Sequence, residues 1–446
     1  MRLVSTTMLK KIGAITALVL TLPLWLFSQE NSPYSRFGLG DLSNTKNAVN
    51  RAMGGVAAAY SDFQSVNFLN PASYSNLRIT TFDIGTEINS RTLKDVQAQQ
   101  KYTSSNLLVN YLQIGIPLLN NAKAFNKHKS WGLNFGLQPM TRVSYKITTT
   151  TRQTDSLGLV NEGSGGSYYA FVGTGYKIKN LSVGINFGYL FGSRDINNRK
   201  VFLNDTVYYA KSNIRNKANF GGVYYTLGAQ YFILLKEGKD KKPAEYLRLG
   251  AYGSMKQKIR ATTDSTYETF LYDANGGVYE VDSIYKKNGI KSTINYPATY
   301  GVGILYEKEG KYSIGIDYTQ SKWSTYSFGG VKDQLTDSWT IHVGGQVTGT
   351  RKKTKNEKPP LTYRGGFYYG QDIMSVTGKM PVWAVSLGAA LPVFNRNRFS
   401  TQFTVINTFL EFGNRGQKSN IVKENFIRLG VGFSLSDLWF RKYKYQ

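Results

Sequence analysis

The sequence has no cysteine and only two histidines among its 446 residues. Without cysteine, the chain can form neither a disulfide framework nor a thiolate zinc or iron–sulfur site, and it offers no cysteine for a lipid anchor. Two histidines also exclude most imidazole metal sites, so we expect no metal and no cofactor. Helix-forming residues do not cluster, whereas Gly (45), Tyr (32) and Phe (24) are abundant. This composition favours a chain made mostly of strands.

Long apolar runs are also scarce. One begins at Ile12, directly after Lys10 and Lys11, and ends at Phe27. It is too short for a comfortable transmembrane helix, and it predicts a secretory signal peptide over residues 1–28, with a retained signal anchor as the alternative. The net charge of +27 could indicate a nucleic-acid-binding protein, but exported chains rarely meet nucleic acid. We therefore expect no nucleic-acid partner.

From about residue 78 onward, apolar and small polar residues alternate with a period of two. In residues 181–191, six apolar side chains fall on one face, and Ser182, Gly184, Asn186 and Gly188 fall on the other. Soluble sandwiches alternate as well, but the alternating segments here run to about 10–17 residues, the length of a tilted membrane crossing. Aromatic residues gather near the segment ends, where the girdle of a membrane barrel lies. They include Trp131, Tyr168, Tyr169, Tyr224, Tyr225, Tyr296, Tyr300, Trp339, Tyr368, Tyr369 and Trp383.

Fourteen such segments predict an all-β, closed, antiparallel transmembrane barrel over residues 78–436. The segments are residues 78–89, 102–116, 130–147, 166–177, 181–194, 219–235, 244–262, 296–307, 312–325, 336–348, 361–372, 382–392, 399–412 and 425–436. Every connection longer than 13 residues follows an odd-numbered segment. The long loops, such as 148–165, 195–218 and 263–295, are therefore assigned to the outside, and the short turns to the periplasm. After removal of the signal peptide, the chain is expected in a bacterial outer membrane, in contact with its lipid.

Positive charge concentrates in the predicted periplasmic turns and in the C-terminal tail, residues 437–446. Together they hold 20 Lys or Arg and five Asp or Glu. The densest part of this basic rim comprises Lys236, Lys239, Lys241, Lys242, Arg351, Lys352, Lys353, Lys355 and Lys358. Attraction to anionic lipid headgroups explains it. Docking of an acidic periplasmic protein is the alternative.

Residues 29–77 lack strand alternation and are rich in small residues, so they are either disordered or folded into the barrel as a plug. Gly54 and Gly55 permit a sharp bend, and Asn70, Pro71 and Ala72 immediately precede the first strand. These motifs resemble the N-terminal hatch of the FadL-like family of outer-membrane transporters for long-chain fatty acids and hydrocarbons. The opening at residues 31–40 and the Trp439-Phe440 pair are similar to the branch of that family found in the Bacteroidetes. Without the resemblance, Asn70-Pro71 could simply begin a turn.

The resemblance implies a hydrophobic ligand, a lumen gated by the hatch, and a sideways exit at a kink in the third strand. A kink needs Pro, a glycine pair or a bulge to interrupt the ladder. Pro139, in the third segment, is the predicted lateral gate. Gly221-Gly222, Gly344-Gly345 and Gly365-Gly366 are the other interruptions of this kind, and a Pro merely tolerated near a strand end is the simpler interpretation of Pro139.

Alternation also places several charged residues in the lumen. They are Asp83, Glu87, Arg248, Asp317, His342, Arg364 and Arg428. Pairing across the barrel or with the hatch is the favoured role, and an arginine binding a ligand carboxylate is the alternative. His342 could in principle serve a Ser–His hydrolase, but no paired Ser and orienting acid can be identified, so no enzyme and no catalytic residue is predicted.

Two functions follow from these observations. The first is passive uptake of hydrophobic or amphiphilic small molecules through the hatch-gated lumen, with lateral exit. The second is an accessory barrel of a larger outer-membrane secretion or assembly machine, similar to the FadL-like shuttle barrel of type IX secretion, with a periplasmic or outer-membrane protein as its partner.

Overall fold

A computed structural model of the chain describes residues 32–95, 100–119, 129–152, 156–202, 210–238, 243–273, 277–349, 360–375, 378–394, 402–417, 420 and 422–437. The predicted signal peptide and the predicted tail beyond Asp437 lie outside the described residues. Within the described part, no helix is long and apolar enough to cross a membrane.

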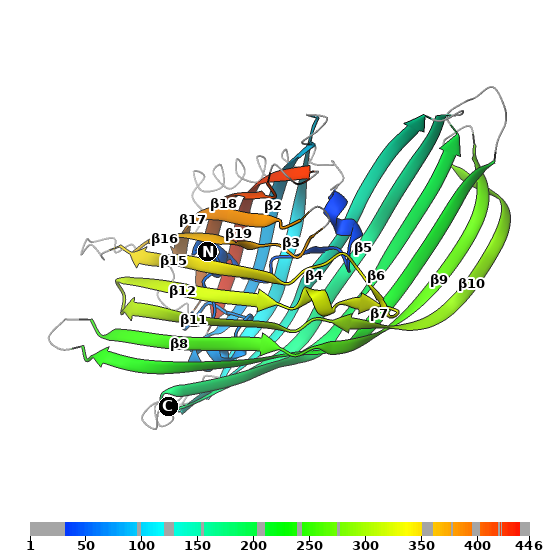
Figure 1. The fold of residues 1–446 in the computed structure, drawn as a ribbon. Coiled ribbons are helices and arrows are strands. Elements are labelled where there is room, and N and C mark those ends of the chain that lie inside the picture. Colours follow the sequence, from blue (N-terminus) through cyan, green and yellow to red (C-terminus); the bar gives the residue numbers. More distant parts are fainter. Residues whose placement is uncertain are drawn as a thin grey trace, which may run out of the picture.

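Fourteen antiparallel strands, counted over the described residues, form a closed wall, as the alternation predicted (Figure 1). Neighbours in sequence pair with each other, and β19 closes the ring by pairing with β2 along its whole length. Two of the fourteen are interrupted midway, so each carries two labels. The strands are β2 (Thr80–Asp95), β3 (Lys101–Leu119), β4 (Lys129–Arg152), β5 (Ser156–Ile178), β6 (Leu181–Phe202), β7 (Lys211–Lys236), β8 (Glu245–Ser254) with β9 (Gln257–Tyr272), β10 (Val278–Tyr296) with β11 (Thr299–Lys308), β12 (Tyr312–Ser321), β15 (Ser338–Thr348), β16 (Thr362–Gln371), β17 (Pro381–Phe394), β18 (Phe403–Arg415) and β19 (Val422–Asp437).

The two faces of the wall divide by polarity. Leu181, Val183 and Phe187 of β6 are exposed on the outside, whereas Ser182 and Asn186 are buried inside. Exposed apolar surface over a whole ring would favour aggregation in water, and it suits contact with the acyl chains of a bilayer. The alternation therefore sets both the strand and its outward apolar face.

The predicted aromatic girdle is wrong for four of its rings. Tyr168 and Trp383 are exposed on the outer surface, but Tyr169, Tyr224 and Tyr296 are buried inside the barrel. Tyr368 also points inward, where its hydroxyl donates to Glu411 at 3.2 Å. Adjacent residues of a strand point to opposite faces, so a Tyr-Tyr pair can give only one ring to the lipid.

The predicted outer loops at 148–165, 195–218 and 263–295 are mostly strand, which corrects that prediction. Thr148 pairs with Val160 between β4 and β5, and Leu159 with Lys200 between β5 and β6. Figure 1 shows β4, β5, β6, β7, β9 and β10 extending together beyond the rest of the wall. These stretches contain no Pro and many Thr, which suits a ladder. Their alternation is among polar residues, so counting apolar positions did not detect it.

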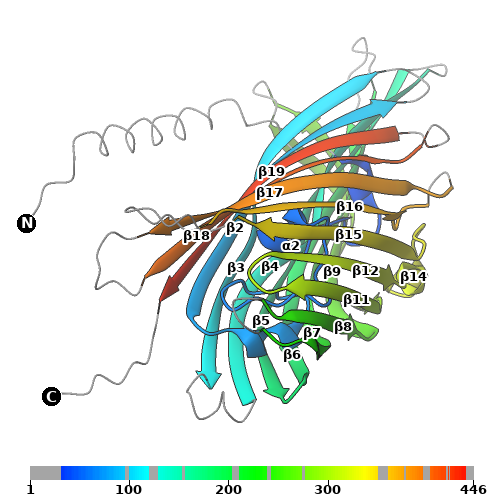
Figure 2. The same ribbon diagram turned by 90° about the vertical axis from the view of Figure 1, so that its left-hand side faces the viewer.

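The N-terminal segment, residues 32–77, lies within the ring of strands and is drawn in blue in Figures 1 and 2. It contains η2 (Pro33–Arg36), β1 (Asp41–Leu42), α2 (Ala48–Ala52) and η3 (Pro71–Asn76). α2 contacts β16 to β19, whereas η3 contacts β3 to β7. The segment thus reaches both sides of the lumen. Between β12 and β15, the chain forms η4 (Trp323–Thr325), β13 (Ser327–Phe328) and β14 (Val331–Lys332).

Candidate functional site

Glycines on the inner wall allow direct backbone contact with the N-terminal segment. A Cβ added to Gly184 would lie 2.4 Å from the Pro71 carbonyl carbon, and one added to Gly366 would lie 2.3 Å from the Gly54 nitrogen. Four further inner glycines have backbone atoms of the segment equally close, namely Gly132, Gly175, Gly250 and Gly344. Since even a methyl group would not fit, the segment is closely packed against the wall at these points.

Gly54 and Gly55 end the short helix α2 with φ angles of +65° and +92°. L-residues with side chains rarely adopt this conformation, so the Gly-Gly pair permits the turn that sequence reasoning expected. The turn brings the Gly54 carbonyl oxygen to 2.7 Å from His342 Nδ1 on β15. A residue from the predicted hatch motif thereby meets one of the predicted lumen residues.

Asn70 joins the segment to the opposite wall. Its Oδ1 accepts a hydrogen bond from the Ala72 nitrogen at 3.1 Å, which caps η3. Its Nδ2 donates to the Ala58 carbonyl at 2.7 Å, and to the carbonyls of Ala229 on β7 and Ala251 on β8 at 3.3 and 3.2 Å. Asn70 therefore links the N-terminal segment to the wall by hydrogen bonds. Its role in a hatch remains a prediction.

Arg51 of α2 is the centre of a buried ion-pair network. Its guanidinium contacts Glu87 on β2 and lies 3.3 Å from Oε2 of Glu411 on β18. Arg428 on β19 donates to the other Glu411 oxygen at 2.6 Å. The Arg51 guanidinium also sits 4.2 Å from the ring centroid of Phe409. Sequence analysis named Glu87 and Arg428 but missed Arg51 and Glu411.

A second network forms around Asp41 of β1. Its carboxylate oxygens lie 2.8 Å from Arg91 Nη1 on β2 and 2.9 Å from Arg415 Nη1 on β18, and Ser32 donates to it at 2.6 Å. Burial alone would raise the pKa of Asp41, but the charges of Arg415 and Arg91 outweigh burial and hold the pKa well below its usual range. Like the Arg51 network, these ion pairs join the N-terminal segment to β2 and β18.

Lys46 contacts the wall on β15. Its Nζ lies 3.0 Å from His342 Nε2, which fits a neutral ring that accepts from Lys46 and donates to Gly54 through Nδ1. Burial lowers the pKa of Lys46 to about 8, although Asp317 acts in the opposite direction. Asp317 itself accepts hydrogen bonds from the backbone nitrogens of Ala57 and Ala58 at 2.6 and 2.7 Å.

The remaining predicted lumen residues each have partners. Arg248 donates to the Ser61 carbonyl and forms an ion pair with Glu307. Arg364 donates to Gln346 and Asn407, and Asp83 accepts from Gln113 and Ser434. Of the densest part of the predicted basic rim, only Lys236 is described, and it lies 3.4 Å from Glu245. The rim residues Lys239, Lys241, Lys242, Arg351, Lys352, Lys353, Lys355 and Lys358 lie outside the described residues.

β3 and β4 separate partway along the wall. Their pairing reaches only Leu112 and Leu137, beyond which β3 continues along β2, and β4 along β5. Each strand has an extra residue near this point, Asn110 in β3 and Met140 in β4, where the register shifts. Pro139, the predicted gate residue, directly precedes Met140. Its role in a gate remains a prediction.

The N-terminal segment covers the β4 side of this split. Asp41 and Leu42 pair with Arg142 and Thr141, and the Ser43 nitrogen donates to the Met140 carbonyl at 2.9 Å. Farther along, the Ser32 nitrogen donates to the Ser144 carbonyl at 2.9 Å. Unpaired backbone groups at membrane depth cost several kcal/mol each, so these contacts stabilise the exposed edge of β4. Among the described residues, positions 101–111 of β3 pair with a strand on one side only.

Two cavities adjoin β1 and the residue that follows it, because both are lined by Leu42 and Ser43. One, of about 180 Å³, reaches the split at Leu108, Asn110 and Pro139. Its charged lining includes Asp41, Glu87, Arg91, Arg142, Arg415 and Arg428. The other, of about 140 Å³ and called the aromatic cavity below, is lined by the rings of Phe68, Tyr169, Tyr224, Tyr252, Tyr296 and Trp323. Met140 and polar residues such as Gln138, Asn186 and Thr226 complete its lining. A third cavity, of about 510 Å³, adjoins the turn at residues 308–311.

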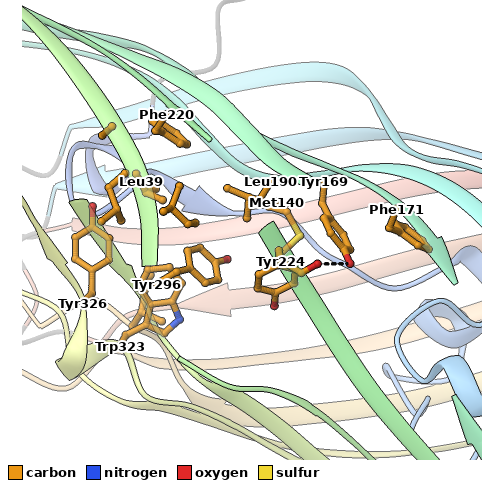
Figure 3. Close-up of a cluster of buried hydrophobic side chains, with 14 of the residues drawn as sticks. Leu39, Met140, Tyr169, Phe171, Leu190, Phe220, Tyr224, Tyr296, Trp323 and Tyr326 are labelled. Atoms are coloured by element: carbon orange, nitrogen blue, oxygen red, sulfur yellow. Dashed lines mark hydrogen bonds between the residues drawn. The ribbon is translucent and has the colours of Figure 1, made fainter. Parts of the chain in front are cut away.

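The aromatic cavity contains a row of rings packed edge to face, shown in Figure 3. The ring centroids of Tyr169 and Tyr224 are 4.9 Å apart, those of Tyr224 and Tyr296 5.5 Å, and those of Tyr296 and Trp323 5.6 Å. Sequence analysis did not assign these rings to a site. The Tyr168-Tyr169 and Tyr224-Tyr225 pairs could have signalled them, because one ring of each pair must point inward.

A sequence model of the BamG family matches residues 8–446. The chain belongs to the BamG family. No match was found among curated proteins. Among solved structures, this BamG-family chain is similar to the toluene transporter TbuX of Ralstonia pickettii (15% identity, TM-score 0.54, covering 88% of this chain and 99% of TbuX). It is also similar to the monoaromatic hydrocarbon channel CymD (14%, 0.53, 89% and 99%) and to a FadL homologue of Pseudomonas aeruginosa (13%, 0.51, 89% and 98%). The predicted FadL-like outer-membrane barrel fold is confirmed.

Proposed function

We propose that this protein takes up hydrophobic or amphiphilic small molecules across the outer membrane. The observation that carries the proposal is the split between β3 and β4, with a cavity directly behind it. The aromatic cavity shares Leu42 and Ser43 with the cavity at this split. Movement of the N-terminal segment, acting as the hatch, would join the two cavities and let the molecule leave sideways into the membrane.

The chemistry of the two cavities supports a ligand with one apolar and one polar end. Aromatic rings and Met140 bind apolar groups without specific hydrogen bonds. The cavity at the split contains Arg91, Arg142, Arg415 and Arg428 beside several carboxylates, and arginine can bind a carboxylate in a bidentate manner. Solved structures with this fold include toluene transporters and a monoaromatic hydrocarbon channel, which agrees with an apolar cargo.

Deleting Met140 tests the lateral exit. Without this extra residue, β4 would lose its bulge next to Pro139, and its edge could continue along β3. We expect uptake of radiolabelled toluene and of oleate into cells to fall at least tenfold, whereas Phe135→Leu, an outward change on the same strand, leaves uptake unchanged. Equal uptake in the deletion variant, with the barrel correctly inserted, would rule out exit at this split. Pro139→Ala should lower uptake less, because it leaves the extra residue in place.

Membership of the BamG family favours a second candidate, an accessory barrel of a larger outer-membrane assembly or secretion machine. The ion pairs that hold the N-terminal segment in the lumen are compatible with a barrel that does not open. Purification in mild detergent separates the two candidates. A stoichiometric large protein partner supports the machine, and a lone barrel that retains a bound lipid supports transport. For a periplasmic partner, neutralising Lys352, Lys353 and Lys355 should release that partner.

A further inference from the structure

Three cations gather on the outward face of β9 and β10. Lys258 and Arg260 are two positions apart on β9, and Lys291 lies on β10. Arg260 pairs with Thr293 and Lys291 pairs with Thr262, so Lys291 is the diagonal neighbour of Arg260. All three side chains are exposed. We refer to Lys258, Arg260 and Lys291 as the β9–β10 basic patch.

The patch has no anionic partner among the described residues. The residues directly opposite its cations in the ladders are neutral, namely Asn295, Thr293, Gly221 and Thr262. Some other cations of the wall do have an anionic partner, such as the exposed Arg215 with Asp195 at 2.6 Å and the half-buried Lys308 with Glu245 at 2.8 Å. Asp264, the other diagonal neighbour of Lys291, accepts a hydrogen bond from the Gly289 nitrogen at 2.8 Å and forms no ion pair with the patch among the described residues. The three cations therefore repel one another unless an external anion lies between them.

The patch adjoins the outer edge of the lipid-facing band. Val223 on β7, Met255 between β8 and β9, and Tyr300 on β11 are apolar or aromatic residues exposed by 50%, 61% and 41%. Farther along the same strands, in the direction of the long extension, follow Gly221, the cations of β9, and Lys291. Long strand extensions face the cell exterior in such barrels. The patch therefore lies at the depth of the outer-leaflet headgroups.

The Tyr189 hydroxyl and the missing side chain of Gly221 also shape the surface beside Arg260. A Cβ added to Gly221 would meet the Tyr189 hydroxyl at 2.6 Å, so this hydroxyl lies over Gly221. Gly221 is the direct ladder partner of Arg260. A ligand that reaches Arg260 above the bare glycine could therefore also accept a hydrogen bond from Tyr189.

We propose that the β9–β10 basic patch binds the phosphate group of an outer-leaflet lipid. Arg260 offers a planar pair of N–H donors for phosphate oxygens, and Lys258 and Lys291 supply further positive charge. A lipid fits better than free phosphate, because the exposed apolar residues Val223, Met255 and Tyr300 lie farther along the same strands and would hold its acyl chains. The bound lipid would anchor the extended strands at the membrane surface.

The test measures binding of diphosphoryl lipid A to the full barrel in detergent micelles, by native mass spectrometry and by equilibrium titration. The variant K258Q/R260Q/K291Q should bind it at least tenfold more weakly than the wild type. The control K286Q/K287Q/K332Q removes three other exposed cations and should bind like the wild type. Dephosphorylated lipid A should bind both variants equally weakly. Tyr189→Phe should lower the affinity for diphosphoryl lipid A a few-fold. Heat-modifiable gel migration establishes that each variant is folded.

Two results would overturn the proposal. One is equal binding of diphosphoryl lipid A by the patch variant and by the control variant, both folded. The other is displacement of the lipid from the wild type by inorganic phosphate at low millimolar concentration, which would show that the patch is a site for free anions.

Discussion

The sequence predicts which individual charged side chains point into the lumen, but it does not predict which of them pair with each other. Alternation identified Glu87 and Arg428, because each stands out among neighbours of its strand. Glu411 was missed because it is enclosed by Phe409-Leu410 and Phe412, which read as one apolar run. Arg51 was missed because α2 has no period from which its direction could be inferred. Which charges meet across a lumen depends on barrel closure, and alternation along single strands does not encode that.

Replacing Arg51 tests whether its network stabilises the plugged state. Arg51→Met leaves Glu87 without its buried partner. Glu411 keeps Arg428 but loses its ion pair with Arg51. Because an uncompensated buried charge is costly, we expect the free energy of unfolding to fall by about 3–5 kcal/mol, measured by urea titration in micelles. The double variant Arg51→Met/Glu87→Gln should recover part of that loss. A loss below about 1 kcal/mol in the single variant would contradict the role of the network.

Lys46 predicts a pH dependence. Below about pH 8 its ammonium is protonated in both the folded and the unfolded chain, so the full cost of burying the charge is present. Between about pH 8 and its ordinary value of 10.5, the folded chain has lost the proton and the unfolded chain has not. Stability should therefore rise by up to about 3 kcal/mol over this range, relative to Lys46→Met measured in parallel. If the two proteins show the same pH profile, Lys46 does not titrate as described.

At the scale of elements, all fourteen strands could be predicted because each must present an unbroken oily face to lipid. The outer ends of the strands could not be predicted, because there β4, β5, β6, β7, β9 and β10 continue as ladders between polar residues. The split between β3 and β4 was anticipated only through Pro139. The second bulge, at Asn110, has no Pro or Gly beside it and left no signal in the sequence.

Two adjacent glycines of β16 provide a matched test of how closely the segment fits. A Cβ on Gly366 would lie 2.3 Å from the Gly54 nitrogen, whereas one on Gly365 would approach nothing nearer than 3.6 Å. Gly366→Ala should therefore lower the free energy of unfolding by about 1–3 kcal/mol, and Gly365→Ala should be nearly neutral. If both substitutions change urea unfolding to a similar extent, the loss of stability at Gly366 comes from strand propensity and not from contact with the segment at Gly54.

At the scale of the whole molecule, a ring of strands with an apolar outer face encloses a lumen that the N-terminal segment occupies. The segment both fills the lumen and covers the free edge of β4. On the proposed uptake route, displacement of β1 would expose backbone groups at the split and join the two cavities that share Leu42 and Ser43. Plugging and lateral opening would then be coupled through residues 41–45.

Sidedness decides how the transport route and the β9–β10 basic patch are placed, and it can be tested because the chain has no cysteine of its own. Lys332 on β14 and Lys311 beside the tight turn after β11 are both exposed, at opposite ends of the barrel. A membrane-impermeant maleimide should label Lys332→Cys in intact cells, whereas Lys311→Cys should react only after the outer membrane is permeabilised. The reverse pattern would place the long strands in the periplasm. It would remove the patch from the outer leaflet, and it would require the ligand to enter from the other end.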